Sequence, residues 1–244
     1  MRELHQAARA LARSQRVVAL TGAGVSAESG VPTFRGPGGL WRNYRPEDLA
    51  TPEAFARDPA LVWEWYQWRQ GIVAGCQPNP GHLALVEMEA EWPDFTLVTQ
   101  NVDGLHRRAG SRRLLELHGN LTQARCTREG RVVDLPRARG LPRCPCGALL
   151  RPHVVWFGEA LDPQILEAAF QASRTCQVFL SIGTSALVAP ASTLPLLAHE
   201  RGAVVVEINP QPTALPAACL DVVLRGPSGE ILPRLLAEAR RLRG

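Results

Sequence analysis

The 244-residue sequence contains no lysine, so all 27 of its basic residues are arginine. It has no apolar run close to the ~20 residues that a membrane-spanning helix needs. Its first residues hold no long apolar segment and no cleavage site, which argues against a secretory signal. These absences predict a cytoplasmic protein without a membrane partner. The apolar fraction of 45% excludes a disordered chain and suffices for one sizeable core, or for a large domain with a small insertion.

The sequence also lacks the G-x-G-x-x-G fingerprint of ordinary dehydrogenases. The apolar run Val17–Leu20 predicts a buried strand, and Gly22 and Gly24 follow it, but the next glycine is Gly30. A glycine-rich turn after a strand lets backbone N–H groups approach a phosphate, and a helix N-terminus adds a favourable dipole. The spacing therefore indicates a dinucleotide site, but not that of a dehydrogenase.

No nucleic-acid-binding motif accompanies the net charge of +4. Arginines cluster at 107–108, 112–113 and 240–243. Such clusters are typical of solvated faces and helix ends, so we expect no specific nucleic-acid partner.

Strand-like and helix-like segments alternate along the chain. The apolar runs are Val17–Leu20, Phe95–Val98, Val178–Ile182, Val204–Ile208 and Val222–Leu224. Asn79 and Asp162 each precede a proline and predict helix N-caps, and Ser228 is expected to cap the last helix. The alternation predicts an α/β fold, with a parallel sheet covered by helices on both faces.

Two segments break this alternation. Residues 37–78 hold helical patterns and four of the six tryptophans, and residues 121–150 are short, rich in arginine and proline, and hold three cysteines. We expect both to be insertions into a nucleotide-binding domain made of residues 1–36, 79–120 and 151–244.

Four motifs together carry a resemblance to a known family. They are the run 22–36, the sequence Thr-Gln-Asn-Val-Asp at 99–103, His118-Gly119, and the run 151–159. The chain resembles the sirtuins (Sir2 family), which are NAD-dependent protein deacylases. The resemblance implies a Rossmann-like NAD-binding domain, a helical insertion and a small zinc-ribbon-like insertion.

The resemblance also assigns catalytic roles. His118 would be the general base, and Asn101 and Asp103 would bind the nicotinamide carboxamide and orient a water. An imidazole with an ordinary pKa near ~6.5 is suited to accept a ribose hydroxyl proton at neutral pH. Gln100 would bind the nicotinamide ribose.

Further contacts follow from the same resemblance. NAD contacts are implied for Gly22, Ala23, Gly24, Glu28, Phe34, Arg35, Asn101, Asp103, Gly183, Thr184, Ser185, Asn209 and Pro210. Contacts to the substrate peptide, which would add as a strand, are implied for Val154, Phe157, Gly158, Glu159 and Val188.

The implied reaction consumes NAD without moving a hydride. The acyl oxygen of a modified lysine attacks C1′ of the nicotinamide ribose, and nicotinamide leaves. His118 then removes a ribose hydroxyl proton, the acyl group passes to that oxygen, and water releases free lysine and O-acyl-ADP-ribose. The partners would be acylated-lysine proteins or peptides. This chain, lacking lysine, cannot itself be acylated on lysine side chains.

Tyr66 and Arg69 lie three residues apart on the helix predicted after Asp58, so they share a face. The pair could be an aromatic core face with a surface arginine. It also resembles the Tyr-x-x-Arg pair of sirtuins that remove succinyl, malonyl or glutaryl groups, and Ala27 would leave room in such an acyl pocket. Because a guanidinium can hold a carboxylate bidentately, we expect a preference for acidic acyl groups over acetyl.

The cysteine pattern departs from that of a zinc ribbon, which has two C-x2-C pairs. Cys126 has no second cysteine three residues on, where Glu129 stands, and the second pair is contracted to Cys144-Pro145-Cys146. Three thiolates and a carboxylate could hold a structural zinc, less tightly than four thiolates. The alternative is a module that folds without metal.

Other functions stay open from the sequence. The enzyme could be a plain NAD-dependent deacetylase or a mono-ADP-ribosyltransferase that uses the same NAD site. It could instead be an NAD-binding regulator without turnover, although the His118 motif argues against this.

Overall fold

The computed structural model describes residues 2–33, 45–135 and 140–244. Phe34 and Arg35, expected to contact NAD, lie outside the described residues.

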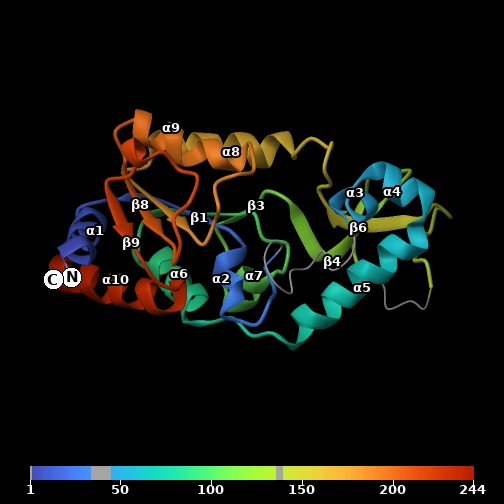
Figure 1. The fold of residues 1–244 in the computed structure, drawn as a ribbon, viewed down its shortest axis with the longest axis horizontal. Coiled ribbons are helices and arrows are strands. Elements are labelled where there is room, and N and C mark those ends of the chain that lie inside the picture. Colours follow the sequence, from blue (N-terminus) through green and yellow to red (C-terminus); the bar gives the residue numbers. More distant parts are fainter. Residues whose placement is uncertain (1, 34–44, 136–139) are drawn as a thin grey trace.

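A six-stranded parallel sheet forms the centre of the larger part of the molecule (Figure 1). Its order is β3-β2-β1-β7-β8-β9. The strands are β1 (Arg16–Thr21), β2 (Asp94–Thr99), β3 (Leu114–Glu116), β7 (Val178–Ile182), β8 (Val204–Ile208) and β9 (Val222–Leu224). The five predicted strands are confirmed. The short β3 was not predicted, because its three half-buried residues form no distinct apolar run.

Helices cover both faces of this sheet, as predicted (Figure 1). One face is covered by α1 (Arg2–Ala12), α6 (Pro80–Glu91) and α10 (Ser228–Arg243), the other by α8 (Pro163–Thr175) and α9 (Leu194–Glu200). Each face has its own hydrophobic cluster, with Phe95 and Leu180 pointing to one and Val98 and Phe179 to the other. Short elements complete this part: α2 (Ala23–Ala27), α7 (Leu105–Ala109), and 3-10 turns at Ala191–Thr193 and Ala217–Cys219.

The predicted helix starts are mostly confirmed. The side chains of Asp58, Asn79 and Asp162 each accept a backbone N–H from the first turn of the helix that follows. Ser228 is the exception, because its hydroxyl donates to a Glu28 carboxylate oxygen at 2.9 Å instead of capping α10. A carboxylate at this helix N-terminus complements the helix dipole.

A second, smaller unit lies at one end of the molecule (Figure 1). It contains α3 (Pro46–Leu49), α4 (Pro52–Arg57) and α5 (Pro59–Gly75), together with an antiparallel sheet of order β5-β4-β6. The sheet strands are β4 (Gly119–Cys126), β5 (Val132–Asp134) and β6 (Leu150–Val154).

The helices and the small sheet of this unit share one hydrophobic cluster. The buried Trp63 indole of α5 donates to the Leu150 carbonyl of β6 at 2.9 Å. The two expected insertions are thus joined by packing although they are far apart in sequence. The predicted boundaries at 120/121 and 150/151 both fall inside strands, since β4 begins at Gly119 and β6 ends at Val154.

Strand order determines where a ligand can bind. From β1 the chain continues outward to β2 and β3 on one side, and later from β7 to β8 and β9 on the other. In open parallel sheets, the crevice at the carboxyl ends of the strands where the order reverses is the usual ligand site. Here that place is the boundary between β1 and β7. Within the described residues, none of the helices has the length and apolar character needed to cross a bilayer.

Candidate functional site

The loops that follow β1 and β7 pack backbone against backbone at this boundary. The Gly24 N–H donates to the Gly183 carbonyl at 2.8 Å, and the Gly22 N–H donates to the Ile182 carbonyl at 3.0 Å. A Cβ on Gly22 or Gly24 would lie 2.8 Å from the Gly183 oxygen, and Gly183 itself has φ of +59°. Only glycine fits these three positions, so both loops expose main chain to the crevice, as a phosphate-binding loop requires.

Polar side chains from three strand ends meet beside these loops. Gln100, after β2, donates from Nε2 to the Thr184 hydroxyl at 2.9 Å. Asn209, after β8, donates from Nδ2 to the Thr184 carbonyl, also at 2.9 Å. Thr184 therefore links the loops after β2 and β8, and Ser185 and Pro210 are the next residues after Thr184 and Asn209.

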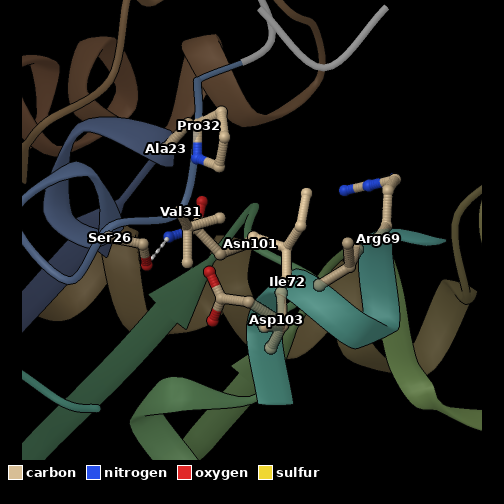
Figure 2. A pocket seen from close by; sticks show the side chains of 10 residues that line it. Ala23, Ser26, Val31, Pro32, Arg69, Ile72, Asn101 and Asp103 are labelled. Carbon is tan, nitrogen blue, oxygen red and sulfur yellow. Dashed lines mark hydrogen bonds between the residues drawn. The ribbon is translucent and has the colours of Figure 1, made fainter. Parts of the chain in front are cut away.

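Asn101 and Asp103 line a pocket next to the glycine loops (Figure 2). Asn101 donates from Nδ2 to the Gly22 carbonyl at 3.0 Å and to the Ser26 hydroxyl at 3.2 Å. These bonds place the amide oxygen of Asn101 as the group left to accept a hydrogen bond from a ligand. Ser26 was not singled out from the sequence, although it lies within the motif at 22–36.

The Asp103 carboxylate lies just before α7 and accepts the N–H of its first residue, Leu105, at 2.9 Å. Burial raises the pKa of Asp103, while the Leu105 N–H, the Ser26 hydroxyl and the positive charge of Arg69 oppose that rise. A buried carboxyl group with a shifted pKa is a candidate to form a hydrogen bond with a ligand or to exchange a proton with it.

His118 is held in one tautomer next to this pocket. Its Nδ1 lies 3.0 Å from the Gln100 carbonyl, which can only accept, so Nδ1 carries the proton and Nε2 presents a lone pair. Burial lowers the pKa of His118, and the Gln100 carbonyl partly opposes this. The imidazole is therefore neutral at neutral pH and ready to accept a proton at Nε2.

The expected peptide segment, residues 151–159, begins within β6 and continues past its end. Phe157 is 54% exposed and Val188 is 36% exposed, so both present apolar surface, whereas Val154 is buried. Gly158 has φ of +86°, which marks the turn. The Glu159 carboxylate is held internally: it accepts from the Arg151 guanidinium at 2.5 and 2.8 Å and from the Trp156 N–H at 2.9 Å. These contacts tie Glu159 to Arg151 and Trp156 of the same segment.

Arg69 and Tyr66 occupy different places on α5. Arg69 is 5% exposed and lines the pocket opposite Asn101 and Asp103 (Figure 2). Tyr66 is 1% exposed and its hydroxyl accepts the Trp156 indole N–H at 2.8 Å. That bond leaves the phenolic proton able to donate elsewhere, and burial raises the pKa of Tyr66, which keeps the proton in place.

Two other expected site residues lie away from this pocket. Ala27 is exposed and does not belong to the pocket lining. The Glu28 carboxylate binds the Ser228 hydroxyl and the Gly229 N–H, each at 2.9 Å, so it ties the glycine-loop segment to α10.

A thiolate cluster in the small sheet fits a metal. The ligand atoms of Cys126, Glu129, Cys144 and Cys146 all lie within 4.8 Å of one another. Cys126 Sγ is 3.5 Å from Cys146 Sγ, and Cys144 Sγ is 3.7 Å from Glu129 Oε2. Tetrahedral zinc with bonds of ~2.3 Å to sulfur sets its ligand atoms about 3.8 Å apart. The donor set therefore fits structural zinc, for which Glu129 would supply the fourth ligand.

Fold and site together define a class. The chain is an α/β protein in which two glycine loops meet at the switch point of a parallel sheet, His118 bonds to the loop after β2, and a small antiparallel sheet packs against a helical unit.

A model of the Sir2 family matches residues 22–190, and the chain belongs to that family. It is 54% identical, over 234 residues, to a Pyrobaculum aerophilum protein named NAD-dependent protein deacylase 2. The matched region covers 95% of this chain and 94% of that protein. It is 50% identical, over 235 residues, to NAD-dependent protein deacylase 1 of Archaeoglobus fulgidus, at 95% and 96% coverage.

Solved structures agree in fold. A Sir2 homologue–NAD complex is 48% identical with a TM-score of 0.92, covering 98% of this chain and 94% of that one. A Sir2 protein bound to a myristoylated histone peptide is 33% identical with a TM-score of 0.79, at 99% and 98% coverage. The predicted sirtuin fold and the predicted NAD-dependent deacylase family are confirmed.

Proposed function

We propose that this protein removes acyl groups from protein lysines with NAD as co-substrate, and that it prefers acidic acyl groups. The observation that best supports the deacylase activity is the hydrogen bond between His118 Nδ1 and the Gln100 carbonyl. That hydrogen bond holds His118, which follows β3, against the loop after β2 that carries Asn101 and Asp103, two residues that line the pocket. Relatives named NAD-dependent protein deacylases, and one structure with an acylated histone peptide, support the same conclusion.

NAD would supply the electrophilic ribose carbon and the leaving nicotinamide. The residues of this chain divide the remaining work. The Gly22 and Gly183 loops would let main chain approach the phosphates, and Gln100 would contact the nicotinamide ribose. Asn101 and Asp103 orient the carboxamide and a water, and His118 accepts a hydroxyl proton at Nε2. The exposed Phe157 and Val188 would flank the substrate peptide.

The acyl preference rests on where Arg69 lies. Its guanidinium is buried and lines the same pocket as Asn101 and Asp103, which must hold the reacting end of the substrate. Burial lowers the pKa of Arg69, while Tyr66 and the negative charge of Asp103 oppose this, so the charge is costly in this place and the carboxylate of an acidic acyl group would add a further stabilising partner. The rings of Trp65 and Tyr66 lie 4.7 and 5.7 Å from the guanidinium carbon and hold it in position. The Tyr66 hydroxyl can add a second hydrogen bond.

The test measures nicotinamide release from NAD with peptides that differ only in acetyl-, succinyl- or malonyl-lysine. A charge-assisted hydrogen bond contributes roughly 1.5–3 kcal/mol, or about 10- to 150-fold in kcat/KM. Arg69→Met with Tyr66→Phe should lose that advantage on the acidic peptides and keep some deacetylation. Arg57→Met is the matched control, since Arg57 is an exposed arginine on α4, away from the pocket.

Each other outcome has a distinct meaning. Equal loss on all peptides would contradict the acyl assignment and leave Arg69 a structural role. Turnover on acetyl-lysine alone would show a plain deacetylase. Nicotinamide release that does not depend on peptide would favour ADP-ribosyl transfer, and NAD binding without release would favour a regulator.

A further inference from the structure

A buried polar cluster lies behind the pocket, and none of the expected site motifs explains all of it. His106 of α7 contacts Thr21 at the end of β1, which contacts Thr99 at the end of β2. His82 of α6 lies beside His106, with the ring centroids 4.7 Å apart. All four side chains are at most 2% exposed. Burying polar groups this deep costs free energy unless they are hydrogen-bonded, so the hydrogen bonds of this cluster need an explanation.

The hydrogen bonds of the cluster fix the direction of each proton. The Thr21 hydroxyl donates its single proton to Thr99 Oγ1 at 2.8 Å, so it can only accept from His106 Nε2, which is 2.9 Å away. His106 therefore carries its proton on Nε2. His82 accepts the Asn79 N–H at Nδ1, at 3.3 Å, so its proton is also on Nε2.

Both imidazoles are neutral. Burial lowers the pKa of His82 to about 4 and that of His106 to about 3. Among the described residues, His82 Nε2 and His106 Nδ1 have no hydrogen-bond partner, and they are complementary, since one is a donor and the other an acceptor. Each ring thus has one defined tautomer, and the hydrogen bonds run in one direction, from His106 to Thr21 to Thr99.

This chain of hydrogen bonds continues to the loop of residues 100–103, called the catalytic loop below because it holds Asn101 and Asp103. Thr99 Oγ1 accepts a second hydrogen bond, from the Asn101 N–H at 3.0 Å. Its two lone pairs are therefore filled by Thr21 on one side and by Asn101 on the other. The Asn101 side chain then reaches Gly22 and Ser26.

We propose that His106 is a positioning residue for the catalytic loop, acting through Thr21 and Thr99 on the backbone of Asn101. By donating to Thr21, it leaves the Thr21 hydroxyl only one direction in which to donate, toward Thr99. Thr99 in turn holds the Asn101 N–H, which sets the amide in the pocket. The catalytic meaning of this chain of bonds rests on the proposed deacylase function, but its structural part does not.

The experiment compares two substitutions of His106. Glutamine can place an N–H donor near the position of Nε2, whereas phenylalanine keeps the ring and removes the donor. His106→Phe should lower kcat for nicotinamide release by roughly 10- to 100-fold with little change in the KM for peptide, and His106→Gln should restore most of it. Exchange of the Asn101 backbone amide should quicken roughly 2- to 12-fold in His106→Phe, as expected for one weakened hydrogen bond.

Further variants separate positioning from general damage. Thr99→Val should match His106→Phe, and Thr99→Ser, which keeps the hydroxyl, should restore most of the lost kcat. Because both act on one chain of bonds, the double variant should be hardly worse than either single one. His199→Gln, on α9 and outside the cluster, is the histidine control.

The outcomes decide the proposal. Equal activity of His106→Phe and His106→Gln, unchanged exchange at Asn101, or additive effects in the double variant would each overturn it. If the unsubstituted protein proves inactive on every acyl peptide, the proposed function fails. The Asn101 exchange and the ¹⁵N signals of an Nε2-protonated His106 still test the positioning chain.

Discussion

Replacing Gly119 with alanine should damage the fold and the site together, because Gly119 follows His118 and pairs β4 with β6. Its φ is +80°, and an added Cβ would lie 2.1 Å from the His153 carbonyl oxygen, far inside the 3.0 Å limit of real Cβ contacts. That oxygen belongs to β6, which pairs with β4 at Gly119 and Val154. It cannot move away without separating the two strands.

The magnitude can be worked out in two parts. A non-glycine residue in the left-handed region costs about 1–2 kcal/mol. Overpacking against a backbone atom that cannot rotate away adds about 1–3 kcal/mol. Gly119→Ala should therefore lower the free energy of unfolding by about 2–5 kcal/mol. It should also lower kcat by roughly 10- to 100-fold, because displacement of β4 moves His118.

Gly130→Ala is the matched control. Gly130 also has a positive φ, of +68°, but nothing lies within 4 Å of an added Cβ, so only the backbone cost applies. The difference between the two variants in the free energy of unfolding, measured with urea, gives the cost of the clash. The rate of nicotinamide release measures the effect on the site. If Gly119→Ala unfolds at the same urea concentration as Gly130→Ala and keeps its kcat, the reasoning from the close approach is wrong.

Three further predictions concern other parts of the molecule. Glu129→Cys should hold zinc more tightly against a chelator than the unsubstituted protein, as measured by zinc retained per chain; equal retention would show that Glu129 is not a ligand. Arg225→Met should lower stability by about 1–3 kcal/mol in urea, because it leaves the Glu207 carboxylate, which is 1% exposed, without its partner at 2.7 Å; a change below the error would show that the Thr213 hydroxyl suffices. The free energy of unfolding should fall as pH drops below about 6.5. In the unfolded chain both histidines bind a proton near that pH, whereas in the folded protein the pKa of His82 is about 4 and that of His106 about 3. His82 alone accounts for on the order of 3 kcal/mol by pH 4, and a flat profile from pH 7 to 5 would contradict this.

The main sheet could be read from the sequence because its strands are buried on both faces. Such strands are continuous apolar runs, as at Val178–Ile182, and an Asx residue before proline marks the helix that follows. Ser228 shows the limit of that reading. Its hydroxyl could bond a backbone N–H or a distant carboxylate, and only the approach of Glu28 to α10 decided between them.

The second unit shows the same limit at a larger scale. Local pattern separates residues 37–78 from 121–150, since one is helical and the other is rich in cysteine and proline. Their shared core depends on contacts between elements such as α5 and β6, which are some ninety positions apart: Trp63 bonds to the Leu150 carbonyl. No short-range pattern records such a contact.

By itself the sequence determined the family, the α/β class and the glycine loops, and it predicts His118, Asn101 and Asp103 as site residues, because these depend on residue type and on spacing along the chain. The tertiary structure decided which proton each buried histidine carries, that Arg69 enters the pocket while the Tyr66 hydroxyl meets Trp156, and that Glu129 completes the thiolate cluster. Those outcomes depend on distances and burial between groups far apart in sequence, which are set only when the elements pack.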